Sequence, residues 1–142
     1  TFQQAAKDGS LPAVVLSGEG KSFCAGADLG WMKSMAKYSS SENVKDSGKL
    51  FTMFQTLRDC PVPLLCQVQG HVMGGALGLV AASDLVVAEG GTQFCFSEAK
   101  LGLAPAVISA FVKDKIDFSA MNRWFLTADV FTAATAREMG LV

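Results

Sequence analysis

Short apolar segments alternate with segments of helical spacing along this chain of 142 residues, and this alternation constrains its fold more than any other feature. Runs of apolar residues bounded by Gly, Pro, Asp or Ser are typical of buried strands. Four such segments occur, at residues 13–16, 64–68, 85–88 and 93–96. Because helical patterns separate and follow these predicted strands, the sequence predicts an α/β fold.

The predicted helices have recognisable starts and ends. Ser39 and Glu42 form a capping-box pattern that predicts the start of a helix. This helix must end before Pro61 and Pro63, which exclude helical structure. Within that segment apolar residues recur at spacings close to helical: Val44, Leu50, Phe51, Phe54 and Leu57. The small residues of 76–82 predict a tightly packed buried helix. Further helices are expected over 107–115, 120–127 and 132–139, the last capped by Thr132 and closed by Gly140.

Composition excludes several classes of protein. Half of the residues are hydrophobic, which is enough for one compact core domain covering residues 1–142. The net charge is −1 and Lys and Arg do not cluster, so we expect no nucleic-acid partner. No apolar run approaches the ~18 residues of a membrane helix, and no signal peptide is recognised. Because the chain starts at Thr1 and stops just after Gly140, we expect it to be incomplete at both ends.

The cysteines and the single histidine argue against metal and triad chemistry. The four cysteines lack C-x-x-C spacing and have apolar neighbours, as expected of buried, reduced thiols in a cytoplasmic protein. A histidine-based metal site or a Ser-His-Asp triad would depend on His71 alone. Neither G-x-S-x-G nor H-E-x-x-H occurs. We therefore expect no metal site.

Two turns rich in small residues follow predicted strands. Residues 24–28, Cys-Ala-Gly-Ala-Asp, would leave backbone N–H groups open to a negatively charged oxygen, although an ordinary tight turn with an Asp cap has the same pattern. Residues 70–76 match neither the P-loop nor the G-x-G-x-x-G fingerprint. This second turn either packs a helix closely or presents bare N–H groups at its start.

A carboxylate follows the last predicted strand. Glu98 has apolar neighbours on both sides in the sequence, so burial would raise its pKa and make it a usable general acid or base. Alternatively, Glu98 faces solvent or pairs with Lys100. If the two turns and Glu98 converge, they form an oxyanion hole beside a base, which is the minimal equipment for enolate chemistry.

Taken together, these segments resemble the crotonase superfamily of enoyl-CoA hydratases and isomerases. The matching stretches run in family order: GKSFCAGADL, QGHVMGGALGLVAASDLVVA, FCFSEAKLGLAP and FLTADVFTAATAREMGLV. The resemblance implies a spiral of ββα units that binds an acyl-CoA thioester. It also implies assembly as a homotrimer or homohexamer, largely through C-terminal helices that we expect to lie outside this sequence.

The resemblance also assigns roles to individual residues. It implies that the N–H groups of Ala27 and Gly75 are the oxyanion donors, and that Glu98 is the second of the two glutamates of standard hydratases. The position of the first glutamate holds Gly78. The implied substrate-binding residues are Ala25, Gly26, Asp28, Leu29, Gly30, Gly74 and Gly78.

The implied activity is hydration of an α,β-unsaturated acyl-CoA, with no cofactor other than the CoA of the substrate. Hydration normally uses two carboxylates, to orient the water and to pass a proton. Without a glutamate at position 78, Glu98 performs both steps, another group or a water substitutes, or the reaction is not hydration. A double-bond isomerase and a non-catalytic acyl-CoA-binding scaffold are the alternatives. Residues 27–32, 74–78 and 103–109 resemble bacterial methylglutaconyl-CoA hydratases of leucine breakdown. Trp31 and Met32 either line the acyl or pantetheine site or belong to the core.

Overall fold

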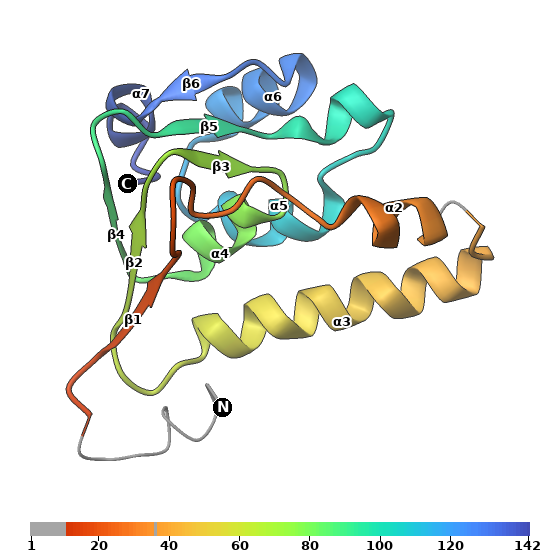
Figure 1. The fold of residues 1–142 in the computed structure, drawn as a ribbon, viewed down its shortest axis with the longest axis horizontal. Helices are drawn as coiled ribbons and strands as arrows, with labels where there is room; N and C mark the ends of the chain where they lie inside the picture. Colours follow the sequence, from red (N-terminus) through yellow and green to blue (C-terminus); the bar gives the residue numbers. More distant parts are fainter. Residues whose placement is uncertain (1–10, 36) are drawn as a thin grey trace.

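The computed structural model describes residues 11–35 and 37–142. The elements in chain order are β1 (Val14–Ser17), α2 (Leu29–Met35), α3 (Ser40–Arg58), β2 (Leu64–Val68), β3 (His71–Met73), α4 (Ala76–Ala82), β4 (Leu85–Ala88), β5 (Gln93–Cys95), the 3₁₀ helix η1 (Ser97–Leu101), α5 (Ala106–Val112), α6 (Phe118–Thr127), β6 (Phe131–Thr132) and α7 (Ala133–Glu138). Strands and helices alternate, which confirms the α/β class (Figure 1).

The described strands form two three-stranded sheets. In the first sheet β1, β2 and β4 are parallel, and Leu65 of the central strand lies opposite Val15 and Leu85. In the second sheet β3 pairs in parallel with β5, and β5 pairs antiparallel with β6. Figure 1 shows the strands of the two sheets running in clearly different directions.

Successive strands belong to different sheets, which gives the fold its repeating unit. The chain passes from β2 in the first sheet to β3 in the second and then forms α4, and the order β4, β5, η1, α5 repeats this path. Gly70 makes the first crossing possible. Its φ is +62°, and a Cβ there would lie 2.0 Å from the carbonyl oxygen of Lys21. These ββα units match the expected spiral.

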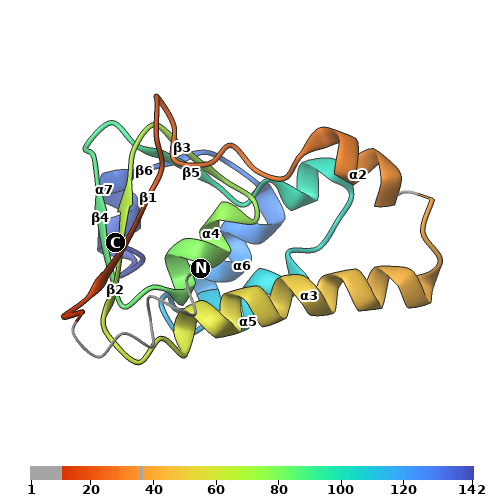
Figure 2. The same cartoon turned by 60° about the horizontal axis from the view of Figure 1, so that its bottom comes forward.

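The core lies where α4 packs against the sheets and against α3 and α5. Leu64, Val72, Leu77 and Phe94 are fully buried there. Phe54 of α3 packs against Phe111 of α5 with ring centroids 5.5 Å apart. In both Figures 1 and 2, α3 runs past α4 and extends beyond the sheets toward α2. The amino-terminal half of α3 is therefore left to form a wall together with α2.

Several expected elements differ from those observed. The capping box of Ser39 and Glu42 is present, and Thr132 caps α7 as predicted. However, β3 lies inside the segment expected to be a turn, and α2 and β6 were not expected at all. Val44 lies in α3 as expected, but it is 70% exposed and does not contribute to the core.

Candidate functional site

Backbone pairing brings the two small-residue turns together. The Cys24 N–H donates to the His71 carbonyl at 3.1 Å, and the Met73 N–H donates to the Cys24 carbonyl at 3.0 Å. Because these two segments are paired, the turn after Cys24 and the turn after Met73 begin side by side. Gly26 has a φ of +116° and Gly74 a φ of +55°, so both turns use a conformation that favours glycine.

The N–H groups of Ala27 and Gly75 are open. Within residues 11–35 and 37–142, neither group donates a hydrogen bond to the protein. Both residues line the same cavity. The neighbouring Gly74 N–H, in contrast, is held by the Cys95 carbonyl at 2.9 Å, which fixes the second turn against the end of β5. Two backbone donors are therefore available to one ligand.

Glu98 lies beside the second turn. Phe96, directly before η1, is fully buried and packs against Phe125 with ring centroids 4.6 Å apart, which anchors the start of η1. A Cβ on Gly74 would lie 3.5 Å from Glu98 Oε1, so the carboxylate reaches the turn that carries Gly75. Glu98 Oε2 is buried and has no hydrogen-bond partner in the described part of the chain.

The surroundings of Glu98 suit a general base. Burial raises the pKa of its carboxyl group, and a hydrogen bond from its own backbone N–H partly opposes this. Lys100 does not pair with it: the Lys100 Nζ lies 3.7 Å from Cys95 Sγ, and no ion pair joins the two residues in the described structure. The alternative of a Lys100-paired glutamate is therefore wrong.

The cavity at this site has a volume of about 670 Å³. At the two turns and η1 it is lined by Gly26, Ala27, Gly74, Gly75, Ser97 and Glu98. Trp31, Met32 and Met35 of α2 form an apolar wall, and Asn43, Ser47 and Leu50 of α3 add to it. Leu101 of η1 and residues 103–108 complete the lining. Figure 2 shows α2 above the amino-terminal half of α3, with η1 between α2 and the sheets.

Not all residues expected to bind substrate line this cavity. Ala25, Asp28 and Gly30 are exposed outside it. Asp28 Oδ1 accepts a hydrogen bond from the Trp31 N–H at 2.8 Å, so its observed contact is the helix cap that the alternative interpretation expected. Leu29 begins α2, and its side chain lies outside the described structure.

Gly78 is also separate from the cavity. It is buried in the middle of α4 and does not contribute to the lining. A Cβ at this position would lie 2.4 Å from Phe54 Cζ and 2.7 Å from Phe54 Cε2. The ring of Phe54 therefore occupies the space next to Gly78, where a longer side chain would have to start.

Sequence reasoning missed part of the lining. Asn43, Ser47, Leu50 and Phe54 follow one another at spacings of four, three and four residues, and this signal defines the inner face of α3. The strong hydrophobicity of Val44 and Phe51 obscured it. Ser97 was not predicted to be a site residue, although it lines the cavity.

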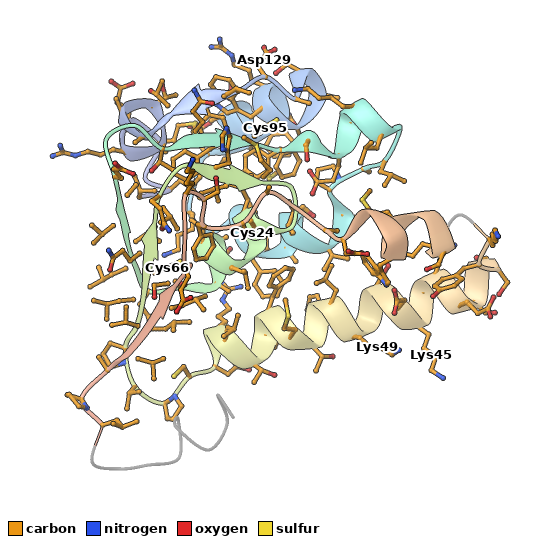
Figure 3. The ribbon with its side chains drawn as sticks, in the orientation of Figure 1. Cys24, Lys45, Lys49, Cys66, Cys95 and Asp129 are labelled. Carbon is orange, nitrogen blue, oxygen red and sulfur yellow. The ribbon has the colours of Figure 1, made fainter. Side chains whose placement is uncertain are left out.

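Apart from Glu98, none of the described residues that line the cavity is charged or carries a thiol. Cys24, Cys66 and Cys95 are separated from one another, and Lys45 and Lys49 project from the outer side of α3 (Figure 3). Among the described residues, no three His, Cys, Asp or Glu side chains gather closely enough to hold a metal ion. None of the described helices is both long and apolar enough to cross a membrane.

Comparisons with known proteins agree with this fold. The crystal structure of an enoyl-CoA hydratase/isomerase (crotonase) candidate from Legionella pneumophila is 42% identical, with a TM-score of 0.96 over 99% of this chain and 54% of that one. An enoyl-CoA hydratase from Shewanella pealeana is 38% identical, also with a TM-score of 0.96, over 99% of this chain and 53% of that one. These solved structures confirm the crotonase fold.

A curated relative gives the same result. Enoyl-CoA hydratase ACTT6 of Alternaria alternata is 33% identical over 99% of this chain and 45% of its own length. The chain thus spans about half the length of the relatives it matches. The model of the enoyl-CoA hydratase/isomerase family matches residues 1–142. The chain therefore belongs to the enoyl-CoA hydratase/isomerase family of the crotonase superfamily.

Proposed function

We propose that the protein is a hydro-lyase that adds water to the double bond of an α,β-unsaturated acyl-CoA thioester. One observation carries this proposal: the open N–H groups of Ala27 and Gly75 and the carboxylate of Glu98 line a single cavity. Two donors and one base are what an enolate-forming reaction requires. Curated relatives named enoyl-CoA hydratases support the reaction type.

The reaction follows from this arrangement. The thioester oxygen lies between the N–H groups of Ala27 and Gly75, which stabilise the enolate oxygen by roughly 3 kcal/mol each in the transition state. As a water oxygen bonds to the β-carbon, Glu98 accepts a proton from that water. Glu98 then gives a proton to the α-carbon, the enolate collapses to the thioester, and the base is restored. No cofactor beyond the CoA of the substrate takes part.

The thioester substrate extends beyond the catalytic groups in both directions. Ala25, Asp28, Leu29 and Gly30 bind its CoA portion. Gly26 and Gly74 lie beside the thioester, and the apolar wall of α2 and α3 holds the acyl chain. A 3-methylglutaconyl chain remains our proposed acyl group. None of the described lining residues is Lys or Arg, so its distal carboxylate would depend on the polar side chains of Asn43 and Ser47.

The proposed assembly is a cytoplasmic homotrimer or homohexamer, built on residues 1–142 as the core domain. Val15, Leu85 and Val87 expose 60%, 60% and 62% of their surface on one face of the first sheet. Apolar groups gathered in this way are typical of surfaces that are covered in the complete protein. This exposed apolar face is therefore a candidate surface for contact with a partner subunit or with further chain segments.

A double-bond isomerase is the second candidate, because one specific observation favours it. The space beside Gly78 is filled by Phe54, so α4 offers no second carboxylate to the site. One carboxylate next to an oxyanion hole can move a proton between two carbons of an enolate without using water. The two reactions share Ala27, Gly75 and Glu98 and differ only in the product.

The test uses the intact protein with crotonyl-CoA and 3-methylglutaconyl-CoA. Loss of the enoyl-thioester absorbance with formation of a 3-hydroxyacyl-CoA supports hydration, whereas a shifted double bond supports isomerisation. The Glu98→Gln variant should lose at least about 10²-fold in kcat and still bind CoA thioesters. The matched control is Glu138→Gln, at an exposed position on α7. Full activity of Glu98→Gln would refute the assignment.

A further inference from the structure

Hydration by a single carboxylate leaves the attacking water poorly fixed. A carboxylate accepts hydrogen bonds and can hold one O–H of the water, but a second contact is needed to aim the oxygen at the β-carbon. The structure shows that Gly78 cannot supply that contact, since Phe54 covers it. Another polar group at the same end of the cavity has to do so.

Ser97 has the required position. Its side chain lines the cavity beside Glu98 at the start of η1. A Cβ on Gly74 would lie 3.0 Å from Ser97 Oγ and 3.5 Å from Glu98 Oε1, so both oxygens approach the same point on the turn before Gly75. The hydroxyl and the carboxylate therefore flank one small region next to an oxyanion donor.

Ser97 also has unused hydrogen-bonding capacity. Within the described residues its hydroxyl makes no hydrogen bond to the protein, although the residue is half-buried. Partly buried hydroxyls ordinarily bond to protein or to ordered water. The other polar lining side chains outside the turns and η1, Asn43 and Ser47, belong to the α3 wall.

Resting on the proposed hydration, we propose that Ser97 is a second catalytic group that holds the attacking water together with Glu98. Ser97 Oγ accepts one O–H of the water while the Glu98 carboxylate accepts the other. The water oxygen then bonds to the β-carbon, its proton passes to Glu98, and Glu98 protonates the α-carbon. Ser97 is chemically unchanged, and it replaces in function the carboxylate that position 78 lacks.

The experiment separates hydration from proton transfer. Hydration of crotonyl-CoA is compared with exchange of the α-protons of butyryl-CoA in D₂O, followed by NMR, because exchange needs the oxyanion donors and Glu98 but no attacking water. Ser97→Ala should lower kcat for hydration by about tenfold or more, the loss expected for a hydrogen bond to an activated group. Its KM and its exchange rate should stay within twofold of wild type.

Control variants distinguish this proposal from the proposed function. Ser97→Thr keeps a hydroxyl and should recover most of the hydration rate, and Ser119→Ala, exposed on α6, should behave as wild type. If Ser97→Ala hydrates crotonyl-CoA at the wild-type rate, or loses hydration and exchange equally, the proposed role of Ser97 is overturned and the proposed function still stands. Glu98→Gln with both reactions intact, or a wild-type protein that exchanges without hydrating, overturns the proposed function and this role with it.

Discussion

Replacing Gly78 by alanine tests the close contact between α4 and α3. A methyl group at this position would lie 2.4, 2.7 and 2.8 Å from Phe54 Cζ, Cε2 and Cε1. The ring has little freedom to withdraw, since Phe54 is 1% exposed and packs edge-on against Phe111. The added carbon therefore has to displace a helix or force the ring from its rotamer.

The expected magnitude combines two opposing effects. Overpacking of this kind typically costs about 1–3 kcal/mol. Alanine gains about 1 kcal/mol over glycine inside a helix. Gly78→Ala should therefore lower the free energy of unfolding by up to about 2 kcal/mol. Phe54→Leu removes the three ring atoms in question, so in that background the same substitution should stabilise the protein by up to about 1 kcal/mol.

The assay is a double-mutant cycle measured by urea unfolding of the intact protein, with circular dichroism as the probe. The cycle should show a coupling of about 1–3 kcal/mol between positions 78 and 54, because each residue senses the other only through their contact. Additive effects, agreeing within about 0.5 kcal/mol, would refute the conclusion that Phe54 fills the space beside Gly78.

Four further outcomes are expected. The kcat/KM should fall as pH is lowered, with an apparent pKa above the ordinary value for a glutamic acid, because burial raises the pKa of the carboxyl group of Glu98, the proposed base. For the same reason Glu98→Gln should be more stable than wild type to urea at neutral pH, and this advantage should shrink as the pH falls through the raised pKa and be gone below the ordinary pKa of a glutamic acid. Ser39→Ala should cost about 1 kcal/mol of unfolding free energy by breaking the capping box, while Ser41→Ala should change it little. Cys66, 1% exposed and with a thiol pKa raised to about 11, should resist thiol reagents at pH 8 until urea unfolds the protein, as mass spectrometry can follow; labelling in the native state as fast as at Cys60 would contradict this.

Features encoded in neighbouring residues could be predicted from the sequence. The strands β1, β2, β4 and β5 are short apolar runs, and the start of α3 is written in Ser39 and Glu42. The burial of Glu98 also follows from its apolar neighbours. Each of these signals depends on a few consecutive residues, and tertiary contacts reinforce it.

Features that depend on distant residues could not be predicted in the same way. His71–Met73 becomes β3 only because Cys24 and β5 supply its partners, and β6 exists through two pairs with β5. The contact between Gly78 and Phe54 joins residues from two helices, and no local pattern announces it. The cavity wall also depends on how α2 packs beside α3, and the spacing of Asn43, Ser47 and Leu50 on its inner face was obscured by the exposed apolar residues Val44 and Phe51.

The pairing of Cys24 with Val72 has a consequence for how such a site can diversify. The spacing of the two proposed oxyanion donors is set by main-chain hydrogen bonds immediately upstream of both turns, so side-chain replacements hardly alter it. Substitutions elsewhere in the chain therefore leave the geometry of the reacting centre unchanged, provided that the residues of the two turns keep small side chains. Substitutions on α2 and α3 can then change which acyl chain fits, because they alter the shape of the cavity wall and leave the two donor turns in place.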